Sequence, residues 1–415
     1  MTQVPSEKHD AYAALKIPEF RLYIAARFCI TIALQIQATV VGWQIYQITK
    51  DPLSLGLIGL AEALPSIIVS LYAGHVADTV SRKGIIISTV SILVLWSAML
   101  WAFTLNSSAF VLAMGVMPIY AVIFASGIAR GFMGPANFSF MPQLMPEKKF
   151  YANAITWSST TWQAASVAGP AIGGLVLGFL GITAAYFVDA ALTVIALLLY
   201  ALIAAKPLPE NEGKLSIKES LLSGIKFVFG NQIILGAISL DLFAVLFGGA
   251  IALLPIFVAD ILKSGAESYG FLRAAPAIGS VLMALYLAHK PITQNAGRKM
   301  LLCVAGFGVC IILFGLSKSY WFSLTLLALS GMFDSISVII RSTLIHTFTP
   351  EYMKGRVSAV NNIFVGSSNE IGSFESGAAA RLLGVVPSVV FGGCMTLLVV
   401  GITALKAKKL RNLQL

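Results

Sequence analysis

Charged residues are scarce in this sequence. Only 11% of the 415 residues are Asp, Glu, Lys or Arg, whereas a soluble domain carries roughly a quarter. Hydrophobic residues make up 58% of the chain, and the mean hydropathy is +0.86. Because so few polar side chains cannot cover a water-facing surface of this size, we expect lipid to cover much of it.

Cysteine and histidine are also rare, with four of each. Every cysteine lies within an apolar run, which favours a small buried side chain over a disulfide or metal framework. No two histidines have the spacing of metal ligands. The chain also lacks a nucleophile–base constellation and a Gly-rich phosphate loop. We therefore expect no metal, no cofactor, no enzymatic activity and no ATP hydrolysis.

The formal net charge of +10 does not indicate nucleic-acid binding. The basic residues are spread through short loops between apolar runs, and no basic domain interleaved with aromatic residues is present. The first 17 residues contain several charged side chains before any apolar run, unlike a cleavable signal peptide. We expect this segment to be a cytoplasmic arm.

Apolar runs of the length needed to cross a bilayer, about 20 residues, recur along the chain. They lie at 20–48, 53–77, 84–104, 108–134, 153–179, 182–205, 232–260, 266–289, 300–317, 320–347, 357–383 and 385–405. The runs at 153–179 and 357–383 are the least apolar, since they are rich in Ser, Thr, Asn and Gly. The sequence thus predicts an all-α integral membrane protein with twelve transmembrane helices.

Lysine and arginine are distributed unevenly between alternate loops. With both termini inside, 20 of the 28 lie on the cytoplasmic side, three on the opposite side and five within the runs. By the positive-inside rule, we predict cytoplasmic termini in a bacterial inner membrane.

The longest polar stretch follows the sixth run and divides the chain. We predict a cytoplasmic arm (1–19), an N-terminal six-helix bundle (20–205), a cytoplasmic linker (206–231), a C-terminal six-helix bundle (232–405) and a basic tail (406–415). Within the linker, apolar residues at helical spacing predict an interfacial amphipathic helix on the cytoplasmic leaflet; they are Leu221, Leu222, Ile225, Val228 and Phe229. Two short internal matches, 81–83 with 297–299 and 145–147 with 349–351, support two related halves.

Three motifs resemble those of one transporter superfamily. Gly74, Asp78, Arg82 and Lys83 have the spacing of the major facilitator signature G-x-x-x-D-x-x-x-R-K/R, although an ordinary basic loop is the alternative interpretation. Arg130 and Gly134 resemble its R-x-x-x-G element. The third, which resembles the G-P-x-x-G-G element found in antiporters, comprises Gly169, Pro170, Gly173 and Gly174. These Gly and Pro residues could equally serve tight helix packing and a kink.

Over nearly the whole chain, these elements resemble the bacterial major facilitator branch that contains enterobactin exporters and related drug and siderophore efflux proteins. The resemblance implies fold more firmly than substrate. Thr79 stands where many relatives carry Arg, and 291–299 lacks the Asp of a second signature copy. We expect a monomer whose partners are a small-molecule substrate, protons and membrane lipids.

Eleven ionisable side chains fall within the apolar runs. Exposed to lipid, each would cost roughly 2.5–3.5 kcal/mol, and together they would exceed a typical stability of about 5–15 kcal/mol. They must therefore mostly face one another or water. The candidates for substrate binding or proton coupling are Glu370, Asp241, Glu62, Arg27, Gln35, Arg273 and Asp334.

Glu370 is the first choice for proton coupling because its run is the most polar, and a buried pair with an Arg on a neighbouring helix is the alternative. Arg27, Gln35 and Gly42 share one face of the first run, which could line an aqueous cavity or form hydrogen bonds in a closed bundle. We also predict a cytoplasmic gate in which Asp78 contacts Arg130 and the helix start near Val357.

The leading functional hypothesis is proton-coupled export of a small amphipathic molecule, siderophore or drug, by alternating access. Uptake of a siderophore or metabolite is one alternative, because one fold supports both directions. Movement of lysophospholipid between leaflets is another.

Overall fold

Long helices account for nearly all of the described chain in this computed structural model, which describes residues 12–105, 114–207, 217–290, 295–350, 353–411 and 413. The N-terminal half contains η1 (Ala14–Lys16), α1 (Pro18–Thr49), α2 (Pro52–Thr79), α3 (Arg82–Leu105), α5 (Met117–Phe140), η2 (Met141–Leu144), η3 (Lys148–Phe150) and α6 (Tyr151–Leu202). After α7 (Ile217–Gly230), the C-terminal half contains α8 (Gln232–Phe247), η4 (Ala250–Leu253), α9 (Leu254–Ile256), η5 (Phe257–Ile261), α10 (Ala266–His289), α11 (Ala296–Leu316), α12 (Tyr320–Phe348), α13 (Lys354–Leu383), α14 (Val385–Lys406) and α15 (Lys408–Arg411). No strand occurs among these residues.

Two membrane spans share the element α6. Its 52 residues would extend about 78 Å as one straight helix, far more than a bilayer core of about 30 Å. Gly181 interrupts it with a φ of 84°, a left-handed conformation that favours glycine. The chain folds back at this residue, between the predicted runs 153–179 and 182–205.

The predicted seventh run, 232–260, is not one helix. After α8 ends at Phe247, the chain passes through η4 and α9 into the π-helical η5. The break falls at Gly248 and Gly249, where a β-carbon on Gly249 would lie 2.5 Å from Ser376 Oγ on α13. Glycine at this point allows the close approach of α13 and ends the regular helix.

The fourth run also differs from its predicted bounds of 108–134. The described helix α5 continues to Phe140 with Pro135 in its interior, and residues 106–113 lie outside the described residues. A transmembrane helix tolerates an internal proline because neighbouring elements satisfy the freed backbone groups.

Ten helical segments in the described ranges are long and apolar enough to cross a membrane. One of them, 153–202, contains the fold at Gly181 and accounts for two spans. Helix α13 has 30 residues but is too polar to be counted among the ten. The architecture is therefore consistent with the twelve predicted spans.

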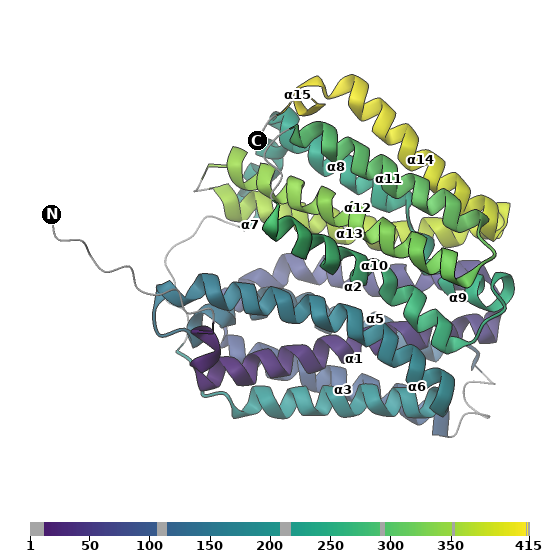
Figure 1. Cartoon of the computed structure of the whole chain (residues 1–415). Coiled ribbons are helices and arrows are strands. Elements are labelled where there is room, and N and C mark those ends of the chain that lie inside the picture. Colours follow the sequence, from purple (N-terminus) through teal and green to yellow (C-terminus); the bar gives the residue numbers. More distant parts are fainter. Residues whose placement is uncertain are drawn as a thin grey trace.

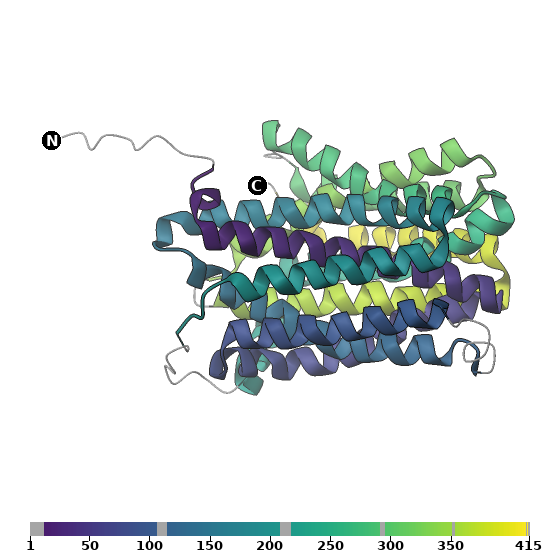
Figure 2. The same ribbon diagram turned by 90° about the horizontal axis from the view of Figure 1, so that it is seen from below.

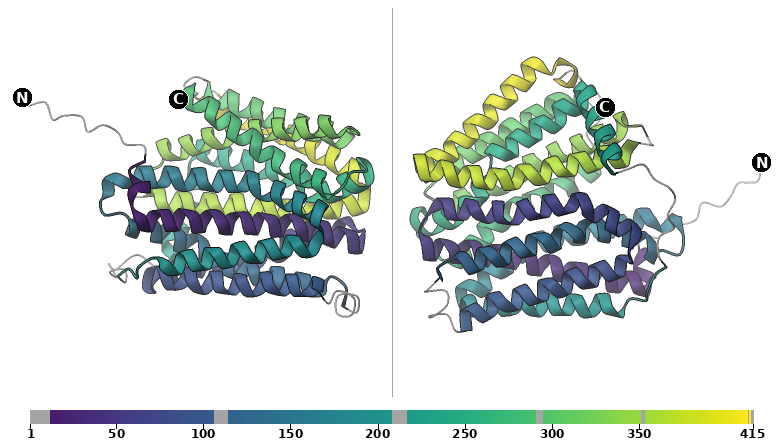
Figure 3. Two further views of the ribbon diagram at one scale, coloured as in Figure 1. Left: turned by 60° about the horizontal axis from the view of Figure 1, so that its bottom comes forward. Right: turned by 180° about the vertical axis from the view of Figure 1, so that it is seen from behind.

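The helices pack as two halves that lie side by side (Figure 1). In the N-terminal half α1 packs on α6 and α2 on α5; in the C-terminal half α10 packs on α12 and α11 on α14. Figure 2 shows the long helices running along a common direction. Contacts between the halves are made chiefly by α2 with α13 and by α6 with α10. The elements η1 and α15 lie at the same end of the bundle (Figure 3).

Candidate transport site

Glycines bring the two halves into backbone contact. A β-carbon built on Gly174 of α6 would lie 2.4 Å from the Cα of Gly270 on α10. On the other side of the interface, a β-carbon on Gly56 of α2 would lie 3.0 Å from the carbonyl oxygen of Phe374 on α13. Larger residues at these positions would separate the halves.

Glu370 lies at this interface. It belongs to α13 in the C-terminal half, and its Oε2 would lie 3.1 Å from a β-carbon on Gly59 of α2 in the other half. Among the described residues it forms no ion pair within 4 Å, although Arg130 and Arg273 act on it electrostatically. These arginines come from opposite halves, so the charge of Glu370 affects the attraction between the two halves.

A second cluster of polar groups crosses the N-terminal half. Glu62 of α2 forms an ion pair with Arg130 of α5. Arg130 Nη2 donates a hydrogen bond of 3.2 Å to Gln37 Oε1 of α1, and Gln37 Nε2 lies 3.5 Å from Asp189 Oδ2 of α6. Ser97 of α3 also interacts with the Asp189 carboxylate. The cluster therefore connects five helices and lines a small cavity beside Glu62 and Arg130.

The C-terminal half contains a buried ion pair of its own. Arg341 of α12 pairs with Asp241 of α8, and both side chains are no more than 5% exposed. Both Arg130 and Arg341 lie on the fourth span of their half. The sequence proposed Asp241 for proton coupling, but its burial against Arg341 resembles a structural pair that fixes α8 on α12.

Arg27 and Arg273 differ from the other arginines within the spans. Arg130, Arg341 and Arg381 each have a carboxylate within 4 Å. Arg27 and Arg273, in contrast, each donate a 3.0 Å hydrogen bond to a tyrosine hydroxyl four residues earlier in the same helix. Neither has a carboxylate within 4 Å among the described residues. Each half thus supplies one arginine whose charge is not neutralised by direct contact.

Two other candidates lie apart from the ion pairs. Asp334 of α12 is partly buried and has no ion-pair partner within the described part of the chain. Gln35 packs its β-carbon against Gly169 of α6, which favours the interpretation of helix contact for this position. Gln37, two residues further along on a different face of α1, makes the polar contacts instead.

The predicted gate is described only in part. The side chains of Gly74 and Asp78 lie outside the described residues. Arg82 Nη1 donates to the carbonyl oxygen of Ser139 at 3.1 Å, and Lys83 Nζ donates to that of Ala201 at 3.0 Å.

Arg130, which was assigned to this gate, is paired with Glu62 instead. About 24 Å of helix separates Glu62 from Asp78 at 1.5 Å per residue. We therefore place Arg130 in the polar cluster that it forms with Glu62, Gln37 and Asp189, which we call the central cluster.

The glycines of the predicted hinge differ in their surroundings. A β-carbon on Gly169 would lie 2.4 Å from the Cβ of Gln35, and a β-carbon on Gly173 would lie 3.2 Å from the Cα of Ile36. Pro170 lies inside α6, and its carbonyl oxygen would lie 2.6 Å from a β-carbon on Gly270 of α10. Around Gly134, by contrast, no atom lies within 4 Å of the added carbon.

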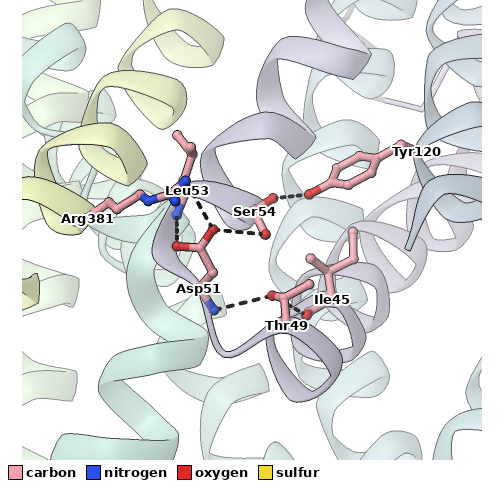
Figure 4. A network of polar contacts seen from close by, with 7 residues as sticks. All are labelled: Ile45, Thr49, Asp51, Leu53, Ser54, Tyr120 and Arg381. Atoms are coloured by element: carbon pink, nitrogen blue, oxygen red, sulfur yellow. Dashed lines mark hydrogen bonds and ion pairs between the residues drawn. The ribbon is translucent and has the colours of Figure 1, made fainter. Parts of the chain in front are cut away.

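Polar contacts join the halves at the end of the bundle opposite η1 and α15. Asp51 caps α2 by accepting from the Leu53 amide at 3.3 Å, and its Oδ2 lies 3.8 Å from Arg381 Nη1 of α13. Figure 4 shows this network, which continues through Ser54 to the Tyr120 hydroxyl. Nearby, Tyr46 of α1 donates a hydrogen bond to Asp260 of η5. We call this end, defined by the Asp51–Arg381 and Tyr46–Asp260 contacts, the joined end.

Sequence reasoning missed Gln37 and Asp189 as members of one cluster. Gln37 carries no motif, and Asp189 was not among the candidates named for substrate binding or proton coupling. Their proximity depends on how α1, α3 and α6 pack, and no local pattern records that packing. Among the described residues, no group of three or more His, Cys, Asp or Glu side chains could hold a metal ion.

The fold, with its polar interface between two six-helix halves, defines a multi-pass membrane transporter of the major facilitator type. Its structure is similar to the POT family transporter PepTSo (TM-score 0.73, 14% identity, covering 95% of this chain and 98% of that one). It is also similar to a bacterial homologue of the lysosomal transporter Spinster (TM-score 0.72, 15% identity, covering 95% and 98%).

The family follows from residues 9–414, which match the major facilitator family described as transmembrane secretion effectors, and the chain belongs to this family. It is similar to the enterobactin exporter EntS of Shigella boydii, with 30% identity over 393 residues, 94% of this chain and 91% of that protein. EntS of Escherichia coli O1:K1 is 28% identical over 390 residues, with the same coverage. The predicted superfamily and fold are confirmed, and the chain is a secondary transporter of the inner membrane, not an enzyme.

Proposed function

We propose that this transporter exports a small siderophore-like molecule in exchange for protons, by alternating access. The position of Glu370 carries the proposal. It is held by α13 against α2 of the other half, within electrostatic reach of Arg130 and Arg273. Protonation would remove its attraction for both arginines, and so would change the relative free energies of the conformations in which the halves meet.

The contacts at the joined end support the direction of opening. With both termini in the cytoplasm, as the positive-inside rule indicates, the joined end faces the opposite side of the membrane. Toward the other end, Gly134 of α5 and Gly366 of α13 have no atom of the described residues within 4 Å of an added β-carbon. We infer that the site is accessible from the cytoplasm in this conformation, and that Gly74, Asp78, Arg82 and Lys83 form a gate that closes on that side.

The arginines without a carboxylate contact favour an anionic substrate. Arg27 and Arg273 come from different halves, and their partners are neutral tyrosines. A charged group in a low-dielectric site is favoured by an opposite charge nearby. The siderophore exported by the EntS relatives is therefore a suitable first probe.

The test uses purified protein in proteoliposomes with enterobactin as the probe. Glu370→Gln should abolish movement driven by a pH gradient and retain enterobactin exchange between the two sides. Glu375→Gln is the matched control, because Glu375 lies on the same helix and its carboxylate interacts with the neighbouring Ser376; it should leave both activities unchanged. Normal gradient-driven transport by Glu370→Gln would refute proton coupling through this residue.

Direction and orientation are tested separately. Vesicles of known protein orientation should accumulate enterobactin only when the cytoplasmic face points outward and the lumen is acidic. Accumulation in the reverse orientation would favour uptake. Accumulation of lysophosphatidylcholine that added enterobactin does not inhibit would favour lysophospholipid movement instead.

A further inference from the structure

Helix α7 exposes an apolar face. Leu222 is 62% exposed, Ile225 39% and Phe229 59%, and their spacing places them along one side of the helix. The opposite side is packed into the protein, since Val228 is fully buried and a β-carbon on Gly224 would lie 3.0 Å from the carbonyl oxygen of Arg356 on α13. The orientation of α7 is thus fixed with large apolar side chains pointing outward.

A groove lies beside the end of α7. It has a volume of about 500 Å³ and is lined by Lys226, Phe227 and Gly230 of α7, by residues at the start of α8, and by Lys409 of α15. A volume of this size is typical of sites for small molecules. We call it the linker groove. Among the residues that the structure describes, none that lines the groove is acidic.

The two lysines are brought together by folding of the C-terminal tail. Leu410 is fully buried and packs against Gly236 of α8 and Gly297 of α11, so α15 is anchored and the neighbouring Lys409 is placed at the groove. Lys226 reaches it from α7. Two exposed ammonium groups from segments far apart in sequence therefore line one concave surface.

We propose that the linker groove binds the phosphate of an anionic phospholipid headgroup, while Leu222, Ile225 and Phe229 lie among its acyl chains. Basic grooves at the ends of transmembrane helices attract anionic lipid, at about 1 kcal/mol per Lys near the membrane surface. An amphipathic helix with an outward apolar face binds in the plane of the interface. The groove and the apolar face are adjacent on α7, so one lipid molecule can satisfy both.

A lipid bound in the linker groove would also stabilise the position of α13, the helix that carries Glu370. Arg356 of α13 donates a hydrogen bond of 3.1 Å to Ser223 of α7, and this contact lies on the side of α7 opposite its apolar face. A bound lipid would therefore hold α7 against the helix that carries Glu370.

The experiment measures the thermal stability of the full-length protein in detergent with added lipid. Phosphatidylglycerol should raise the Tm in a saturable way, and phosphatidylcholine should not. Lys226→Gln combined with Lys409→Gln should weaken the apparent affinity for phosphatidylglycerol roughly 30-fold, from the two lysine contributions. Lys263→Gln combined with Lys318→Gln, which removes two exposed lysines elsewhere, is the matched control and should leave it unchanged.

Further arms distinguish a lipid from a free anion. Inorganic phosphate and glycerol 3-phosphate should not raise the Tm, and native mass spectrometry should show phosphatidylglycerol retained by the parent and lost from the double variant. An equal Tm increase from phosphatidylcholine, stabilisation by phosphate alone, or an undiminished phosphatidylglycerol effect in the double variant would each overturn the proposal.

Discussion

Replacing Gly174 by Ala should open the joined end. The added methyl carbon would lie 2.4 Å from the Cα of Gly270, 2.7 Å from its amide nitrogen and 2.9 Å from the carbonyl oxygen of Ala266. All three are backbone atoms, so no side chain can rotate away. Ordinary contact would require α6 and α10 to separate by about 1 Å, and such overpacking typically costs about 1–3 kcal/mol.

This cost applies to one conformation only. The gain in helix propensity from Gly to Ala, about 1 kcal/mol, is present whether or not the halves meet at this end, so it cancels in the conformational equilibrium. The packing cost does not cancel. The ratio of joined to open protein should therefore fall about 5- to 150-fold.

The measurement is the distance between spin labels at Gln47 and Lys318, two exposed positions on different halves near the joined end, in a protein without its four cysteines. Gly174→Ala should shift the distribution to longer distances. Gly134→Ala is the control, because its methyl group would meet no atom within 4 Å. An unchanged distribution in Gly174→Ala would refute the reasoning from close backbone contact.

Three further predictions concern other contacts. Asp241→Asn should lower the free energy of unfolding by about 3–5 kcal/mol, because it leaves the buried charge of Arg341 unpaired; Leu at both positions should recover most of the loss in thermal unfolding. Arg381→Gln should change the ratio of joined to open protein, measured by the spin labels, by less than about fivefold. Arg381 is 59% exposed, and its pair with Asp51 is screened by salt. Gly181→Ala should lower the free energy of unfolding by about 1–2 kcal/mol, measured by thermal unfolding, because its φ of 84° is unfavourable for any residue with a β-carbon.

Each of these has a distinct contrary outcome. A stable Asp241→Asn protein with impaired proton coupling would restore the functional interpretation of this residue. A large, salt-independent effect of Arg381→Gln would mean that this pair is a principal contact of the joined end. An unaffected Gly181→Ala protein would show that the chain can fold back there without a left-handed residue.

The central cluster shows the limit of sequence reasoning. Glu62 and Arg130 could be identified singly, since an ionisable group within an apolar run requires a partner. Their mutual pairing could not be identified, because it depends on the packing of α2 against α5. For the same reason the motif resemblance placed Arg130 at the cytoplasmic gate, whereas the geometry places it level with Glu62.

Glycines show the same distinction. Gly169, Gly173 and Gly174 were noted as one motif, and the sequence left open whether they pack or move. The structure gives them different neighbours: Gly169 and Gly173 meet α1 in the same half, and Gly174 meets α10 of the other half. A motif records which residues are small, and the arrangement of helices decides what their smallness permits.

The sequence by itself determined that this protein spans a membrane many times, where most of its helices lie and which of its charges require partners, because hydropathy and the cost of burying charge act locally along the chain. The tertiary structure alone decided which arginines are neutralised by a carboxylate, which carboxylate lies between the halves and at which end the halves meet. Those features depend on contacts between residues that are 50 to more than 300 positions apart, and such contacts follow from the packing of whole helices.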